Sequence, residues 1–130
     1  MSVWCNRTLV ISPLYFGLCT SEKMFHKELK KLGVPGNTWP LFISNVWNGA
    51  TTHFFESDKG KTCALVCIRD VEGVTGIEMA ALLVHEAVHI WQAIKENYGE
   101  TNPSDEFEAY SIQHISGQLM DAYHEQKEKK

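Results

Sequence analysis

Residues 75–99 read TGIEMAALLVHEAVHIWQAIKENYG. Thr75 and Glu78 have the spacing of a capping box, in which each side chain satisfies a backbone N–H at the start of a helix. Gly99, at the other end, can adopt the left-handed conformation with which many helices end. The stretch therefore predicts a helix over residues 76–98.

The apolar residues of this segment recur at helical spacing. Intervals of four and three residues predict one apolar stripe that faces the core. The stripe expected from this spacing consists of Ile77, Ala81, Val84, Val88 and Trp91. On this assignment His85 and His89 lie at the edge of the stripe, beside a buried face.

His85, Glu86 and His89 form an H-E-x-x-H pattern within the predicted helix. Residues four apart lie one turn apart on the same helix face, so both imidazoles can bind one metal ion. Glu86 lies beside them, where it can accept a proton from a metal-bound water. Zinc is expected because imidazole suits it and its bound water ionises near neutral pH. The alternative is a helix with two partly buried, hydrogen-bonded histidines.

Length and composition indicate one domain over residues 1–130, whose lysine-rich end, 124–130, is expected to fray. A net charge of −4 without a basic patch argues against nucleic acid as a partner. No apolar run approaches the ~20 residues of a membrane helix, which argues against a membrane partner. The chain start lacks the pattern of a signal peptide, and the four cysteines form no C-x-x-C pair. We therefore expect reduced thiols and a cytoplasmic location; the oligomeric state stays open.

Other segments carry weaker signals for helices and strands. The helices expected from capping and periodicity run from Thr20 or Ser21 to about Leu32, and from 104 to about 123. The strands expected from β-branched and aromatic residues are 41–47, 51–56 and 61–69, with a hairpin turn at 57–60 and a strand or extended lead-in at 7–12. This order predicts an α+β fold with an N-terminal helix and a small, three-stranded, mainly antiparallel sheet.

Residues 106–109 read E-F-E-A, and an H-E-x-x-H followed by E-x-x-A resembles the gluzincin metallopeptidases. The resemblance implies that His85, His89 and Glu106 are zinc ligands and that Glu86 is the catalytic base. It also implies a minimal zincin-like domain with a C-terminal ligand helix and an edge strand that pairs with an extended peptide. Residues 85–92 and 106–110 further resemble small H-E-x-x-H proteins of tailed bacteriophages and prophages. This resemblance does not imply a particular substrate.

The third ligand has alternatives, because Glu106 follows His89 by only 17 residues. An antiparallel last helix that rises 1.5 Å per residue would come level with His89 near residue 113, which favours His114. The loop 99–104 can span up to about 20 Å, enough to bring Glu106 back toward the pair. Glu106 is therefore preferred, with His114, Glu108 and Asp105 as alternatives.

A zincin usually has a tyrosine or histidine that stabilises the oxyanion of the transition state. Tyr110 is the first candidate because it follows Glu106 by one helical turn. The alternatives for this role are Tyr98, His114 and His53.

Two functions follow from these expectations. The first is a zinc metallopeptidase that hydrolyses a peptide bond in a protein or peptide. The second is a non-enzymatic, zincin-fold binding module that docks a partner protein. Glu86 favours the enzyme, because a structural zinc site needs no base and closes its fourth position. The short segment before the motif favours docking, since it leaves little chain for a deep cleft.

Overall fold

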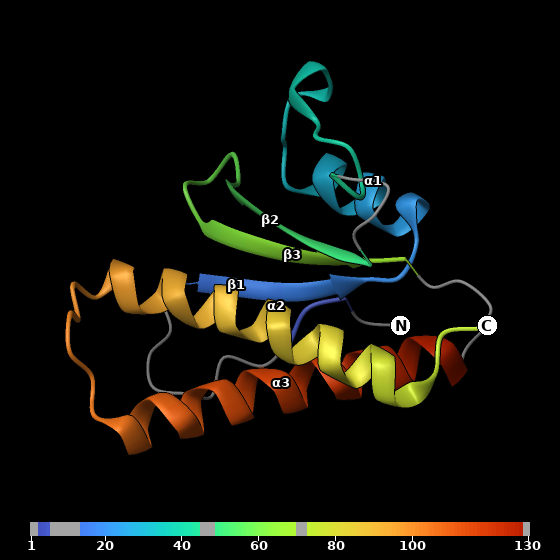
Figure 1. Cartoon of the computed structure of the whole chain (residues 1–130). Helices are drawn as coiled ribbons and strands as arrows, with labels where there is room; N and C mark the ends of the chain where they lie inside the picture. The colour runs from blue at the N-terminus through green and yellow to red at the C-terminus, as the bar shows by residue number, and fades with distance from the viewer. Residues whose placement is uncertain (1–2, 6–13, 45–48, 70–72, 129–130) are drawn as a thin grey trace.

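A mixed sheet of three strands lies at the centre of the computed structural model, which describes residues 3–5, 14–44, 49–69 and 73–128 (Figure 1). β3 (Thr62–Ile68) is the central strand and is apolar and buried along nearly its whole length. β1 (Leu14–Cys19) pairs with it in parallel, and β2 (Ala50–Glu56) pairs with its other side in antiparallel. Because β3 is covered on both faces, its sequence lacks the alternation of a half-exposed strand.

The mixed sheet corrects the expected, mainly antiparallel one. The strands expected at 51–56 and 61–69 are confirmed, but residues 41–44 form no strand and 45–48 lie outside the described residues. β1 is the third strand of the sheet instead. The sequence indicates this strand only weakly, because Gly17 interrupts it. A Cβ at Gly17 would lie 2.6 Å from the carbonyl oxygen of Val3, so the backbones approach too closely for a side chain. The expectation for 7–12 also falls outside the described residues.

α1 (Glu22–Lys31) covers one face of the sheet and begins where the sequence predicts. The Ser21 side chain caps its first turn, and Gly33 follows its end at φ +74°. Phe25 and Leu29 pack against Leu65 on the face of β3 that points toward α1. A single 3₁₀ turn, η1 (Gly36–Thr38), follows.

α2 (Gly76–Asn97) and α3 (Asp105–Glu128) lie side by side on the opposite face of the sheet (Figure 1). Thr75 and Glu78 form the predicted capping box at the start of α2, and Gly99 follows its end at φ +69°. The sheet contributes one row of apolar side chains to the core, which the two helices complete. The largest fully buried members of that core are Leu14, Leu18, Ile68, Met79, Leu83, Ile90, Ile115 and Leu119.

The buried face of α2 differs from the predicted stripe. Ile77 is 85% exposed and Val84 is 39% exposed, so the expected stripe faces outward for much of its length. The structure instead buries Met79, Leu83, Glu86, Ala87, Ile90, Trp91 and Ile94. Both sets recur at four- and three-residue intervals, so spacing alone does not choose between them. Contact with both the sheet and α3 decides which face is inside.

The sequence predicts a frayed segment from residue 124, and the structure continues α3 through most of that segment. α3 continues to Glu128, and the Gln126 side chain is fully buried. Gln126 Nε2 donates to the carbonyl oxygen of Leu18 at 2.9 Å, and its Oε1 accepts from Thr20 Oγ1 at 2.9 Å. In the described part of the chain, no helix combines the length and apolar character needed to cross a membrane.

Candidate metal centre

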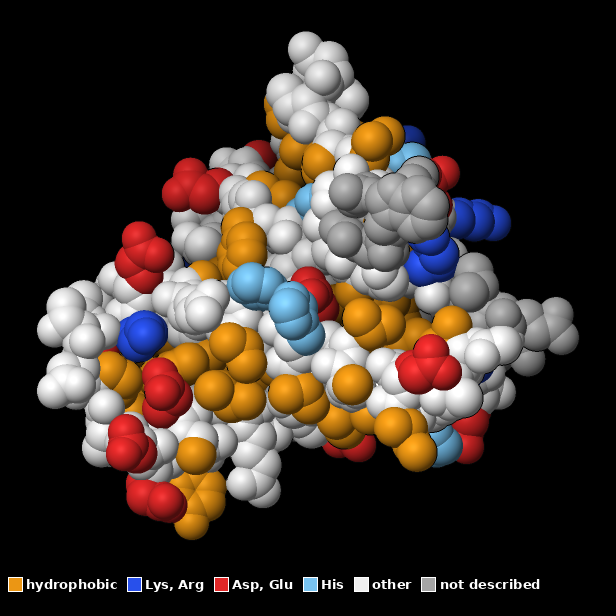
Figure 2. Space-filling model, viewed as in Figure 1, with side chains coloured by type: hydrophobic (Ala, Val, Ile, Leu, Met, Phe, Trp, Pro, Cys, Tyr) orange, Lys and Arg blue, Asp and Glu red, His pale blue; other side chains and the backbone are white. Residues whose placement is uncertain are grey.

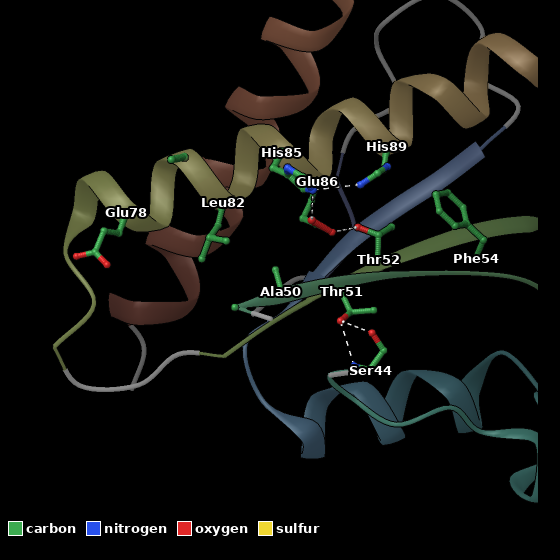
Figure 3. Close-up of a pocket in the computed structure, with 12 residues that line it drawn as sticks. Ser44, Ala50, Thr51, Thr52, Phe54, Glu78, Leu82, His85, Glu86 and His89 are labelled. Atoms are coloured by element: carbon green, nitrogen blue, oxygen red, sulfur yellow. Dashed lines mark hydrogen bonds and ion pairs between the residues drawn. The ribbon is translucent and has the colours of Figure 1, made fainter. Parts of the chain in front are cut away.

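His85 and His89 project from the middle of α2 toward the cleft between that helix and β2 (Figure 3). Their Nε2 atoms lie 3.2 Å apart, and their rings meet edge to face with centroids 4.9 Å apart. Two nitrogens that bind one tetrahedral zinc at 2.0–2.1 Å are separated by about 3.3 Å. The spacing of the two imidazoles therefore fits a shared metal ion.

Gln92 lies one helical turn beyond His89 and contacts its other ring nitrogen. Gln92 Oε1 lies 3.3 Å from His89 Nδ1, an arrangement in which Nδ1 carries the proton and donates. His89 Nε2 then holds the lone pair that a metal requires. An outer hydrogen bond of this kind orients most metal-binding histidines. The sequence motif did not single out Gln92, although its position three residues after His89 was an available signal.

Glu86 points inward from α2 and is only 4% exposed. Its Oε1 accepts a hydrogen bond from Thr52 Oγ1 on β2 at 2.8 Å, which satisfies one oxygen of a buried carboxylate (Figure 3). Its Oε2 lies 3.9 Å from His85 Nε2. The carboxylate is therefore held by the sheet on one side and faces the histidine pair on the other.

Thr52 is a site residue that the sequence analysis missed. The strand over 51–56 was predicted, and side chains alternate between the two faces of a strand. That alternation places Thr52 and Phe54 on the face toward α2, and His53 on the face toward α1. Which face meets the motif helix is a tertiary property, so the sequence alone did not single out Thr52.

Donor atoms of His85, Glu86 and His89 all lie within 4.8 Å of one another, and these residues are the only such group in the described part of the chain. Glu106 is exposed in the first turn of α3 and does not belong to the group. The structure therefore unites three of the predicted site residues and leaves the predicted third ligand apart from them.

The reason is the way in which α3 packs on α2. Trp91 Nε1 donates to Glu108 Oε2 at 2.8 Å, and the Trp91 and Phe107 rings meet edge to face at 5.5 Å. Trp91 is buried and lies on a different side of α2 from the histidines. The first turn of α3 is thus fixed near the end of α2, away from the cleft.

The other predicted residues also lie away from the histidine pair. Tyr110 is 62% exposed and, with His114, lines a shallow depression on α3. Tyr98 caps the end of α2. His53 stacks on Phe25 beneath α1, and its Nε2 lies 3.0 Å from the carbonyl oxygen of Phe42. None of these four residues is among the described residues that line the cleft at the histidines. The structure therefore gives no oxyanion donor among these candidates.

The cleft beside the histidines has a volume of about 730 Å³. Figure 2 shows histidine side chains at the surface in the middle of this face, where α2 meets the sheet. The walls of the cleft are β2 on one side and α2 on the other (Figure 3). The described residues that line it are Ser44, Gly49, Ala50, Thr51, Thr52, Phe54, Glu78, Ala81, Leu82, His85, Glu86 and His89.

The four cysteines lie outside the group formed by His85, Glu86 and His89. Burial raises the pKa of the Cys67 thiol, and its contact with Cys19 and the charge of Glu86 raise it further. Burial likewise raises the pKa of Cys63. Metals bind the thiolate, so thiols held in the protonated form are poor ligands. Cys63 and Cys67 are both buried, free cysteines.

Comparisons of this chain with models of protein families, with curated proteins and with solved structures find no match. The function of this protein is therefore inferred from the geometry of the site.

Proposed function

We propose that this protein is a zinc-dependent peptidase in which His85 and His89 hold the metal and Glu86 is the general base. The observation that carries the proposal is the pair of opposed Nε2 atoms, 3.2 Å apart, with a buried carboxylate beside them. Zinc, when bound at such a pair, acidifies water and polarises the carbonyl of a scissile peptide bond. The donor chemistry of two imidazoles suits this ion.

Glu86 performs the proton transfers in this proposal. Its Oε2 is the oxygen nearer His85, whereas its Oε1 is engaged by Thr52. Oε2 accepts the proton of the attacking water and then delivers it to the leaving amine. The Thr52 hydrogen bond keeps the carboxylate in one orientation during both transfers, which is the task of a positioning residue.

The cleft supports a peptide as the substrate. It is open to solvent along α2, and its walls combine apolar side chains such as Leu82 and Phe54 with the polar edge strand β2. Catalytic zinc sites usually have three protein ligands, and the described residues offer only two imidazoles and the Glu86 carboxylate. We therefore expect weaker zinc binding than at a three-ligand site.

The second candidate function is a module that binds an extended segment in the cleft without cleaving it. The observation that favours it is the position of α3, which supplies no third ligand and no oxyanion donor to the cleft. We propose a reducing, cytoplasmic setting for either function, because the cysteines are free thiols.

A comparison of the wild type with Glu86→Gln distinguishes the peptidase from the binding module. Both proteins are incubated with zinc and a cell-derived peptide library, and cleavage products and bound zinc are measured. The peptidase proposal expects products from the wild type only and equal zinc in both. Equal peptide profiles at every metal concentration would support the binding module instead. Loss of zinc from Glu86→Gln would show that this carboxylate is a ligand.

A further inference from the structure

The cleft at the histidines continues beyond His89 as a second cavity. This second cavity, of about 690 Å³, runs along the C-terminal half of α2 and shares Phe54 and His89 with the first. Together they form one groove along α2, which we call the α2 groove. It begins near Glu78 and reaches Glu96 and Asn97, with His85 and His89 at its middle.

Four residues of α2 follow one line down the α2 groove. Glu78 and Glu96 are 18 residues apart, which is five turns at 3.6 residues per turn, so their Cα atoms lie on the same side of α2. The Glu78 carboxylate turns toward the helix start, where its Oε1 accepts from Thr75 Oγ1 at 3.0 Å. His85 follows Glu78 by seven residues and His89 precedes Glu96 by seven, which places both within about 20° of that line. The order along the groove is therefore an acid, the histidine pair, and a second acid.

Both ends of the α2 groove carry acidic side chains. Glu78 and Glu96 are exposed. Among the described residues that line the two cavities, the acidic ones are Glu78, Glu86 and Glu96, and none is a lysine or an arginine. Lys95 points elsewhere, since its Nζ lies 3.9 Å from Glu108 Oε2 on α3. An occupant with positive charge near both ends complements this arrangement.

The spacing of the acids sets the spacing of those positive charges. Each acid lies nine residues from Ala87, the midpoint of the motif, which is about 13.5 Å at 1.5 Å per residue. An extended peptide covers that distance in about four residues. Since the two distances are equal, either direction of the peptide presents the same pattern.

We infer that the α2 groove binds extended peptides that carry lysine or arginine about four residues to each side of the segment at His85 and His89. Glu78 and Glu96 are the specificity-determining residues. The inference deepens the proposed function and rests on it, in that a peptide is taken as the occupant of the groove.

Binding of labelled peptides by zinc-loaded Glu86→Gln measures this preference without cleavage. The probes are nine-residue, fluorescein-labelled alanine–glycine peptides that carry lysine, alanine or glutamate at both terminal positions. Fluorescence anisotropy at low salt is expected to rank lysine first and glutamate last. Exposed ion pairs are worth little, so each contributes about 1.5- to fivefold in affinity. The lysine preference is expected to shrink in 0.5 M salt.

Two substitutions remove the charges while keeping the helix intact. Glu78→Gln retains the capping box, because glutamine serves at that position as well as glutamate, and Glu96→Gln lies at an exposed position. The double variant is expected to bind the three peptides equally. The control is Glu22→Gln, which makes the same charge change in α1, across the sheet from the groove.

The outcomes separate this inference from the proposed function. A lysine preference that disappears in the double variant supports the inference, even if the wild type cleaves no peptide. A wild type that cleaves peptides without any preference for flanking lysine overturns the inference and leaves the proposed function standing. No measurable binding of the lysine peptide, or an equal loss in Glu22→Gln, also overturns it.

Discussion

The hydroxyl of Thr52 on β2 donates a 2.8 Å hydrogen bond to the buried carboxylate of Glu86 on α2. This bond joins the edge of the sheet to the motif helix at the centre of the groove. It satisfies one oxygen of a carboxylate that is almost completely removed from solvent. A buried polar group without such a partner would destabilise the fold.

Thr52→Val removes this donor at nearly constant volume. We expect it to lower the free energy of unfolding by about 1–3 kcal/mol, because Glu86 Oε1 is left unpartnered. Thr52→Ser retains the hydroxyl and should lose much less. Urea denaturation of the three proteins measures the difference. A valine variant as stable as the wild type would show that the bond does not hold Glu86.

Gln92→Leu removes the acceptor that faces His89 Nδ1. Outer-sphere partners of this kind typically change metal affinity by about 10- to 100-fold, so we expect at least a tenfold weaker affinity for zinc. Gln92→Glu keeps an acceptor and should bind zinc at least as well as the wild type. Competition with a chromophoric chelator gives both affinities. Gln92 is exposed, so a loss of zinc affinity should not come from unfolding. Wild-type zinc affinity in the leucine variant would show that Gln92 does not set the tautomer of His89.

The stability of the protein is expected to fall above pH 9. Burial, with a smaller effect from Asp121, raises the pKa of Cys5 from 9.0 to about 12. The folded state therefore keeps this proton while the unfolded state loses it, so the stabilisation is complete below pH 9 and is lost as pH rises toward 12. Between pH 9 and about 10.5 this one thiol costs roughly 2 kcal/mol. Cys5→Ala should show a shallower decline in urea denaturation, and an unchanged slope would contradict the assignment.

Gln126→Ala tests whether the end of α3 belongs to the folded core. The substitution leaves the Leu18 carbonyl and the Thr20 hydroxyl without the partners that Gln126 provides. We expect a loss of roughly 2–4 kcal/mol in the free energy of unfolding. Gln113→Ala, at an exposed position of the same helix, should change it by no more than about 0.5 kcal/mol. Equal small effects would mean that the end of α3 frays, as the charged sequence suggests.

Local signals in the sequence were sufficient for several elements. The capping box of Thr75 and Glu78 predicts the start of α2, and Gly99 predicts its end. The turn at 57–60 predicts the hairpin of β2 and β3. These features depend on neighbours in the chain, and each was confirmed close to its predicted bounds.

Tertiary contacts decided what the sequence could not. Two apolar stripes of α2 have the same spacing, and packing against the sheet and α3 selects the one with Met79 and Leu83. The histidine pair was predictable because its geometry is internal to one helix. The contacts of Thr52 and Glu106 were not, because each depends on how a second element packs. α2 continues about 12 Å beyond His89, so the start of α3 lies too far along it to reach the pair.

Anomalous X-ray diffraction from zinc-soaked crystals, recorded on both sides of the zinc absorption edge, tests the central claim most directly. The account predicts one peak per chain within 2.0–2.2 Å of Nε2 of both His85 and His89. Glu86 should lie beside the peak, and no side chain of α3 should contact it. A peak that instead involves Glu106 or His114, or no peak at the histidine pair at saturating zinc, would contradict the account.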